Sequence, residues 1–295
     1  MQFLKETHIK FTEHSKKAIS VSLLIIFAGL ISLIFVRGLN YSIDFTGGTL
    51  NHIKFEKEIE SNDLRRALEN TGIDKSVVQG TNHPREYFIR LPKYSEEGGV
   101  ADQVKEALTS LDPNYETLST KGVGPQIGEE LRRNATFAII GALVVIGLYI
   151  SFRFKFYFAL GAVAALIHDV LFTLGIFSFT QMEISISTIA AFLTIVGYSL
   201  NDTIVLYDRI RENMQTKKRF DIRDLIDNSI NQVLSRTIIT SLTTLFVVVV
   251  LSFAFGEVKI FAYAMVIGVI TGTFSSIYVA GPVLIAWQKK IKTSS

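Results

Sequence analysis

The chain has 295 residues with a formal net charge of +3, and 48% of its residues are hydrophobic and 19% charged. Such a small net charge does not indicate nucleic-acid binding, and a chain without cysteine has no disulfide or thiol redox chemistry of its own. The apolar residues occur in blocks long enough to cross a hydrocarbon core, which takes about 20 helical residues. This distribution predicts an integral membrane protein.

Six apolar blocks predict six transmembrane helices. Each block is apolar on all sides, as expected of a helix that meets lipid and satisfies its backbone internally. We expect the first block to be a permanent span, because a polar stretch precedes it and it lacks the cleavage site of a signal peptide. The predicted spans are residues 18–36, 134–152, 156–179, 184–207, 236–256 and 260–287.

Basic residues predict the orientation of these spans, because cytoplasmic loops are enriched in Lys and Arg. Residues 180–183 contain no basic residue, and the loop after the fifth span contains only Lys259. We therefore expect both termini in the cytoplasm, and we expect the charged, amphipathic residues 208–235 to lie along the cytoplasmic surface. The basic residues that indicate this side are Lys5, Lys10, Lys16, Lys17, Arg153, Lys155, Arg209, Arg211, Lys217, Lys218, Arg219, Arg223, Lys289, Lys290 and Lys292.

The segment between the first two spans, residues 37–133, is predicted to be a folded extracytoplasmic domain. Its elements follow the order βαββαβ, which is that of an α+β ferredoxin-like domain. Isolated histidines and the absence of metal-ligand spacing give no indication of a metal site. The chain is thus divided into residues 1–36, 37–133 and 134–295. The predicted strands are 50–55, 76–79, 87–91 and 115–120, and the predicted helices are 61–70 and 96–111.

Ionisable residues inside a span cost about 2.5–3.5 kcal/mol each, so they are candidate functional groups. Asp202 lies in the fourth span, where it could bind and release a proton or could form a structural hydrogen bond, a role that Asn201 could also fill. Arg236 begins the fifth span at a similar depth. It could pair with Asp202 as part of a proton switch, or it could extend to the lipid headgroups.

His168 and Asp169 occupy the middle of the third span. Either could join a proton relay with Asp202, or could form an ordinary buried polar contact. Hydroxyl-bearing residues on the neighbouring spans are compatible with a hydrated path and also with close helix packing. No phosphate-binding glycine loop is present in the sequence, so nothing indicates a bound nucleotide.

Four stretches of the sequence together resemble one family. They are YSIDFTGGTL (41–50), VGPQIGEEL (123–131), TIVGYSLNDTIVLYDRIREN (194–213) and LSRTIITSLTTL (234–245). These stretches resemble the SecF family, whose members are the smaller membrane subunits of bacterial SecD–SecF complexes. The resemblance covers essentially the whole chain.

The resemblance implies a function. The family belongs to the resistance-nodulation-division superfamily, so six spans would form half of a permease and SecD the other half. By resemblance, Asp202 and Arg236 act in proton conduction, and the complex uses the proton-motive force to promote preprotein export on the outer face of the bacterial inner membrane. The implied partners are SecD, YajC, the SecYEG translocon, the preprotein and membrane lipid. No cofactor, enzymatic activity, nucleic acid or nucleotide is expected.

Glycines flank the domain on both sides, and they are candidate hinges. Gly47 and Gly48 follow the first span, and Gly122 and Gly124 precede the second. Turns alone would also explain them. Asp44 lies beside the first pair, where it could cap or orient the junction.

Two other functions are compatible with the sequence. The chain could be a purely structural subunit that stabilises SecD, or it could be half of a proton-driven exporter of small molecules or lipids. An exporter would need a ligand-sized apolar cleft in the external domain. Replacing Asp202 by Asn distinguishes a titrating carboxylate from a structural one, because the substitution keeps the shape and removes the titration.

Overall fold

The computed structural model describes residues 7–73, 76–81, 83–92, 99–216 and 220–287. Seven basic residues that contributed to the predicted orientation lie outside the described residues: Lys5, Lys217, Lys218, Arg219, Lys289, Lys290 and Lys292. The described residues form two compact units. One is a helical bundle, and the other is built around a sheet and consists of Tyr41–Phe137 together with Ile184–Ile186.

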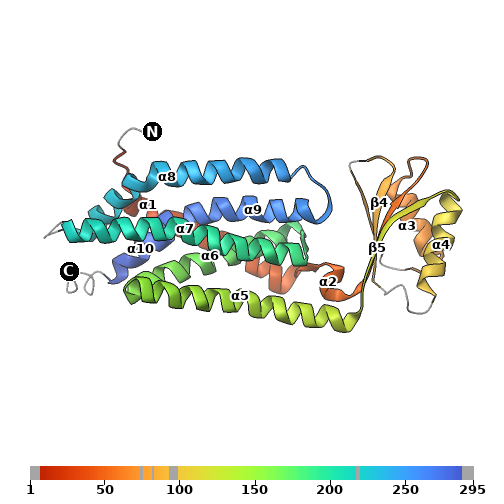
Figure 1. Ribbon diagram of the computed structural model, residues 1–295, viewed down its shortest axis with the longest axis horizontal. Coiled ribbons are helices and arrows are strands. Elements are labelled where there is room, and N and C mark those ends of the chain that lie inside the picture. Colours follow the sequence, from red (N-terminus) through yellow and green to blue (C-terminus); the bar gives the residue numbers. More distant parts are fainter. Residues whose placement is uncertain (1–6, 74–75, 82, 93–98, 217–219, 288–295) are drawn as a thin grey trace. The chain divides into compact units, whose positions relative to one another are not determined.

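Among the described residues, six helices are long and apolar enough to cross a membrane, which confirms the predicted number of spans (Figure 1). Their bounds are α1 (Phe11–Ile31), α5 (Pro125–Arg153), α6 (Phe156–Thr180), α7 (Ile186–Thr216), α8 (Ile222–Leu251) and α9 (Gly256–Ser275). The π-helical η1 (Ser32–Val36) extends α1, and η2 (Ser276–Ala280), α10 (Gly281–Val283) and η3 (Leu284–Trp287) follow α9.

Several helices are longer than the apolar blocks that predicted them. α5 begins at Pro125 rather than at residue 134, and α8 begins at Ile222 rather than at residue 236. Hydropathy marks only the part of a helix that would meet hydrocarbon, whereas a helix continues to its cap. For α8 the cap is Asp221, whose carboxylate accepts the backbone N–H of Arg223 at 2.8 Å.

Residues 208–235 include two helix ends whose apolar side chains pack into the bundle, and their placement along the cytoplasmic surface stays a prediction. α7 continues to Thr216, and the two helix ends pack together: the Asn213 side chain donates to Ser229 Oγ and Gln232 Oε1, each at 2.8 Å. An amphipathic pattern is satisfied by a protein core as well as by a membrane surface. Here the core is that of the bundle, and it buries Ile210, Met214, Ile222, Leu225, Ile226 and Ile230.

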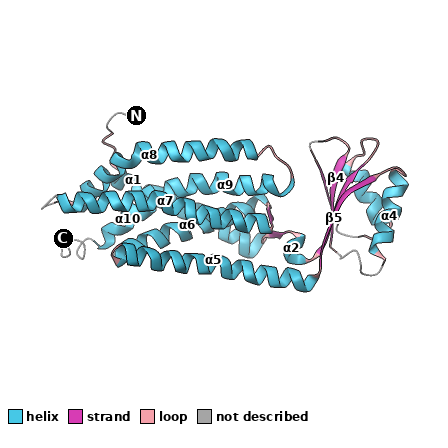
Figure 2. Cartoon of the chain, viewed as in Figure 1, coloured by secondary structure: helices cyan, strands magenta, loops and turns pink. Residues whose placement is uncertain are grey.

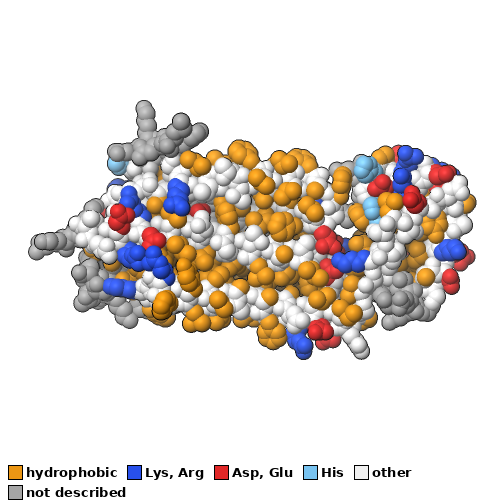
Figure 3. Space-filling model, viewed as in Figure 1, with side chains coloured by type: hydrophobic (Ala, Val, Ile, Leu, Met, Phe, Trp, Pro, Cys, Tyr) orange, Lys and Arg blue, Asp and Glu red, His pale blue; other side chains and the backbone are white. Residues whose placement is uncertain are grey.

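The six spans differ in how much of their apolar surface the bundle buries. About half of the apolar windows of α6, α7 and α9 is buried, against 17% for α8 and 6% for α5. Hydrophobic side chains therefore cover much of the visible helical surface, and Lys and Arg gather at one end of the bundle (Figure 3). Such a surface fits a lipid environment or a partner in the membrane.

The end of the last span is irregular, and a side chain from α7 bonds to its backbone there. Pro282 lacks an N–H and the π-helical η2 precedes it, so the regular backbone pattern is interrupted here. The hydroxyl of Tyr207 donates to the carbonyl oxygen of Ala280 at 3.1 Å. This bond supplies a buried backbone acceptor with a partner.

The second unit contains a four-stranded antiparallel sheet with the strand order β3-β4-β2-β5 (Figure 2). Its strands are β2 (Gly48–Lys54), β3 (Val77–Gly80), β4 (Glu86–Leu91) and β5 (Glu116–Val123), and its helices are α3 (Ser61–Asn70) and α4 (Val100–Leu111). This is the predicted ferredoxin-like βαββαβ arrangement. Before it lie β1 (Asn40–Tyr41), which pairs with β6 (Glu183–Ile184), and α2 (Ile43–Thr46).

The core of this unit lies between one face of the sheet and its two helices. It contains Ile53, Phe55, Leu64, Leu68, Ile89, Leu91, Val104 and Leu108. α3 has its predicted bounds, and Glu60 occupies its N-cap position without a side-chain cap bond. α4 begins at Val100, after Gly99 with a φ of +78°, and the predicted first residues of this helix lie outside the described residues.

Candidate functional site in the helical bundle

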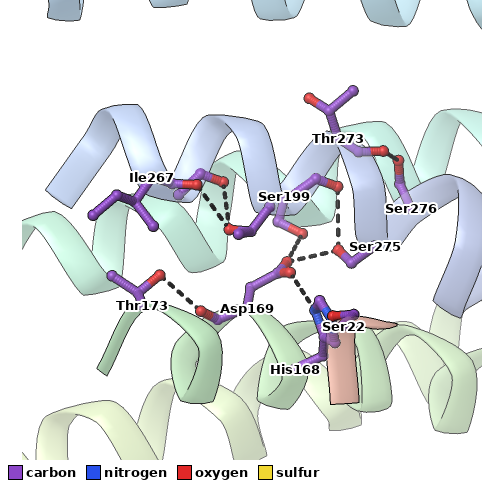
Figure 4. A network of polar contacts seen from close by, with 12 residues as sticks. Ser22, His168, Asp169, Thr173, Ser199, Ile267, Thr273, Ser275 and Ser276 are labelled. Atoms are coloured by element: carbon purple, nitrogen blue, oxygen red, sulfur yellow. Dashed lines mark hydrogen bonds and ion pairs between the residues drawn. The ribbon is translucent and has the colours of Figure 1, made fainter. Parts of the chain in front are cut away.

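The carboxylate of Asp169, on α6, is the centre of a buried polar network (Figure 4). Its side chain is fully buried. Its Oδ2 accepts the hydroxyl of Ser199 on α7 at 2.6 Å and that of Ser275 on α9 at 2.8 Å. Its Oδ1 lies 3.0 Å from Nδ1 of His168. One carboxylate therefore joins three of the spans.

His168 extends this network to α1. Its Nε2 is hydrogen-bonded to the hydroxyl of Ser22, and its ring stacks on Phe274 with centroids 5.9 Å apart. An ionised carboxylate only accepts hydrogen bonds, so Nδ1 carries a proton when Asp169 is charged. The neutral imidazole then accepts the Ser22 hydroxyl at Nε2. Hydroxyl, imidazole and carboxylate thus form a continuous hydrogen-bonded chain.

Glycines allow the helices to approach closely enough for these bonds. A Cβ at Gly272 on α9 would lie 2.9 Å from Cβ of Ser199, and one at Gly268 would lie 2.2 Å from the Ile195 side chain. On the other side of the network, a Cβ at Gly29 of α1 would lie 2.5 Å from Cα of Gly175 on α6. Small residues at such positions permit backbone contact between membrane helices.

Asp202 lies one helical turn after Ser199 on α7, and it is not part of the network. It is 4% exposed, and its Oδ2 is buried without a hydrogen-bond partner among the described residues. The Tyr198 hydroxyl and the Thr203 hydroxyl share this condition. Buried polar atoms are nearly always satisfied in folded proteins. The part of α7 around Asp202 therefore has three buried polar groups without a partner among the described residues, whereas both oxygens of Asp169 have partners.

The predicted partners of Asp202 include Arg236 and Asn201, and both have exposed side chains in the structure. Arg236, on α8, is exposed, and no ion pair within 4.0 Å joins it to the Asp202 carboxylate in the described part of the chain. Asn201 is exposed, because successive helical residues point about 100° apart. Of the predicted pathway residues, all of which the structure describes, His168 and Asp169 have side chains joined by a hydrogen bond.

Two members of the network were not identified from the sequence. Ser22 and Ser275 lie within apolar spans that carry other hydroxyl residues, such as Ser20 and Ser276. Ser275 follows Gly272 by three residues, so a small-residue stripe along α9 could have indicated a helix contact there. No local feature of α1 indicates that Ser22 meets His168. Among the described residues, no group of three or more His, Cys, Asp or Glu could hold a metal ion.

The predicted junction residues occupy distinct places in the sheet unit. Asp44 is buried in α2, and Gly47 and Gly48 follow it with φ values of +73° and +127°. Gly122 lies in β5, and Gly124 comes directly before α5. The left-handed φ values explain glycine at the first pair, and the hinge role of all four stays a prediction.

Two family descriptions match the chain. Residues 103–290 match the C-terminal region of the protein export membrane proteins SecD/SecF, and residues 32–57 match the SecD/SecF GG motif. The longer match contains Asp169 and Asp202, and the shorter one contains Asp44 with its two glycines.

Individual proteins match over nearly the whole chain. It is 41% identical to the protein translocase subunit SecF of Desulfurispirillum indicum, over 97% of this chain and 94% of that protein. It is 42% identical to the protein translocase subunit SecDF of Thermus thermophilus, over 93% of this chain and 38% of that longer protein. A crystal structure of SecDF from Thermus thermophilus, described as a translocon-associated membrane protein, superposes with a TM-score of 0.87 at 39% identity, over 98% of this chain and 40% of that one.

Proposed function

Because this chain belongs to the SecD/SecF family of protein export membrane proteins, we propose that it is a SecF-type subunit that works with a SecD-type partner. In this proposal the complex uses the proton-motive force to promote preprotein export and release on the outer face of the bacterial inner membrane. Both termini lie in the cytoplasm, YajC and the SecYEG translocon are further partners, and the subunit is not an enzyme.

The observation that carries the proposal is the environment of Asp202. A carboxylate that is 4% exposed in an apolar span, with a buried oxygen that has no partner among the described residues, is costly when charged. Protonation removes that charge. A cation on the next helix, Arg236 of α8, favours the ionised form when it approaches the carboxylate. These opposing influences suit a group that changes its protonation state during a transport cycle.

Protonation at this position has a mechanical consequence. An ionised Asp202 attracts the Arg236 guanidinium on α8, whereas a neutral one does not, so the preferred arrangement of α7 and α8 depends on the proton. One charge that moves through 100 mV releases about 2.3 kcal/mol. The movement of many protons thus provides the energy for work on the outer side of the membrane, where ATP is absent.

The unsatisfied groups around Asp202 also support a partner in the membrane. Leaving a buried polar group without a hydrogen bond costs about 1–3 kcal/mol. Tyr198, Asp202 and Thr203 carry three such groups on one helix, and α8 exposes most of its apolar surface. Polar side chains or ordered water at an interface with a SecD-type half would satisfy them. The chain is also only about two-fifths as long as the SecDF polypeptide that it matches.

The Asp169 network is the observation that favours the alternative function, a purely structural subunit. Every oxygen of the Asp169 carboxylate has a hydrogen-bond partner, as expected of a group that holds helices together. We therefore assign helix positioning to Asp169 and the titrating role to Asp202. His168 and Ser22 extend the network toward α1, and they could pass a proton only to Asp169.

The test is Asp202→Asn in the assembled complex, scored by the stimulation of reporter export by a proton gradient. We expect export to fall to its level without a gradient, while accumulation and partner binding stay normal. The matched control is Asp208→Asn, because Asp208 lies on the same helix but has a 41% exposed side chain paired with Arg153. Normal export in Asp202→Asn would overturn the titrating role and favour a purely structural subunit.

A further inference from the structure

A second buried carboxylate, Asp44, holds three segments of the sheet unit together. It lies in the first turn of α2 and is 1% exposed. Its Oδ1 forms an ion pair with Nζ of Lys121 on β5 at 2.9 Å. Its Oδ2 accepts the backbone N–H of Ile186, the first residue of α7, at 3.1 Å. A single side chain therefore contacts the sheet and the beginning of a membrane span.

The bond to Ile186 is a helix cap supplied by a distant segment. The first N–H groups of a helix have no partner within it, and a carboxylate at this end also interacts favourably with the helix dipole. Capping usually comes from the residue before the helix. Here Asp44 provides it from 142 positions away in the sequence. The backbone N–H of Ser42 adds a second attachment, to the carbonyl oxygen of Ile184 at 2.8 Å.

The glycines after Asp44 fix its position on the sheet. At Gly47, a Cβ would lie 3.0 Å from Cα of Pro125, the first residue of α5. At Gly48, the first residue of β2, a Cβ would lie 2.3 Å from the carbonyl oxygen of Leu91 in β4. A side chain at either position would force this backbone or its neighbour in α5 or β4 to move. The pair of glycines thus sets where the Asp44 carboxylate points, as well as allowing the turn.

We propose that Asp44 is a positioning residue that couples the external domain to α7, through Lys121 on one side and the N–H of Ile186 on the other. The inference rests on the proposed function, because α7 is the span that carries Asp202. Asp202 follows Ile186 by 16 residues, or about 24 Å of continuous helix. A displacement of α7 at Asp202 is therefore passed to its first turn, and the carboxylate passes it to β5.

The coupling has a local signature that does not depend on proton transport. In the full complex without a gradient, we expect hydrogen exchange of the Ile186 amide to be roughly tenfold faster in Asp44→Ala, because loss of a helix cap typically has an effect of that size. Asp44→Asn, which keeps an acceptor oxygen, should show a smaller increase. Asp63→Asn is the matched control, because Asp63 lies in the same unit with a 54% exposed side chain. Unchanged exchange at Ile186 in Asp44→Ala would overturn the cap.

The transmission step needs a second comparison, made on peptides that contain Lys121. We expect Asp202→Asn to alter exchange in β5 of the otherwise unchanged complex, and to have no such effect when Asp44→Ala is also present. Lys121→Met should abolish the effect in the same way while it leaves the Ile186 amide protected. If β5 responds equally with and without the Asp44 carboxylate, the coupling role is wrong. Failure of the proposed function would instead appear as normal export in Asp202→Asn.

Discussion

The hydroxyl of Ser199 lies 2.6 Å from Oδ2 of Asp169, which joins α7 to α6 one helical turn before Asp202. Ser199, which bonds to α6, and Asp202, which we propose to titrate, are therefore neighbours on one span. Ser275 donates to the same oxygen from α9, so the position of α7 at this depth is set from two sides. The bonds to Asp169 therefore hold α7 in position one helical turn before Asp202, the carboxylate that we propose to titrate.

The first prediction concerns the hydrogen bonds of Asp169. Asp169→Asn keeps one acceptor oxygen, which the hydroxyls of Ser199 and Ser275 can share as they share Oδ2, but it places an NH2 donor against Nδ1 of His168. We expect a loss of about 1–3 kcal/mol, because the N–H at Nδ1 of His168 loses its acceptor. Ser275→Ala should cost only about 1 kcal/mol, because it removes a single hydrogen bond. Melting temperatures of the purified complex in lipid nanodiscs measure both.

The same melting temperatures can contradict the positioning role of Asp169. If Asp169→Asn melts like the unchanged complex, the network contributes nothing to helix positioning. Export should be scored in parallel at a temperature where the variant is folded. Retained gradient stimulation would be consistent with Asp169 as a structural group, whereas its complete loss in a folded variant would place Asp169 in the proton pathway.

The second prediction concerns the close approach of α7 and α9. Gly268→Ala would put a Cβ 2.2 Å from the Ile195 side chain, so the helices must separate or Ile195 must move. Overpacking of this kind typically costs about 1–3 kcal/mol. The matched control is Gly197→Ala on α7, where an added Cβ meets no atom within 4 Å.

We expect the melting temperature to fall for Gly268→Ala and to stay the same or rise for Gly197→Ala, because alanine is the better helix former. Equal effects of the two substitutions would show that helix propensity, and not helix packing, governs both positions.

The third prediction concerns acid. Burial by itself would raise the pKa of Asp44, but the Lys121 ion pair and the Ile186 N–H outweigh it and hold that pKa below its usual range. The backbone N–H groups of Asn114 and Glu56, which donate to the Asp112 carboxylate, likewise lower the pKa of Asp112. An unfolded Asp titrates near pH 3.9. A lowered folded value means that these groups stabilise the sheet unit above about pH 4 and lose that contribution as the pH falls through the folded pKa.

Hydrogen exchange of the sheet amides, followed at decreasing pH and corrected for the intrinsic exchange rate, tests this prediction. We expect protection to decrease as the pH falls below about 4, and we expect the decrease to be smaller in Asp112→Asn, because one of the two titrating groups is then absent. Protection that increases as the pH falls would contradict the assigned direction of the pKa shifts.

The sequence by itself determined the elements of this protein. Apolar blocks of the required length give six spans, and alternation with turn residues gives the order βαββαβ, because hydropathy and strand periodicity are local properties. The helices α5, α7 and α8 extend beyond the apolar blocks that predicted them, since hydropathy marks the apolar part of a helix and not its ends. Asp202, His168 and Asp169 were identified as buried ionisable groups because charge within a span is conspicuous in any sequence.

Only the tertiary structure decided which of these groups meet. Asp169 bonds to Ser199 and Ser275, His168 bonds to Ser22, and Asp202 keeps an oxygen without a partner among the described residues. Asp44 caps a helix that begins 142 residues later. These contacts depend on how far apart the helices pack and how each is rotated, which glycines such as Gly268 and Gly272 set through contacts with other helices. No local pattern records that distance or that rotation, so the sequence could name the groups without pairing them.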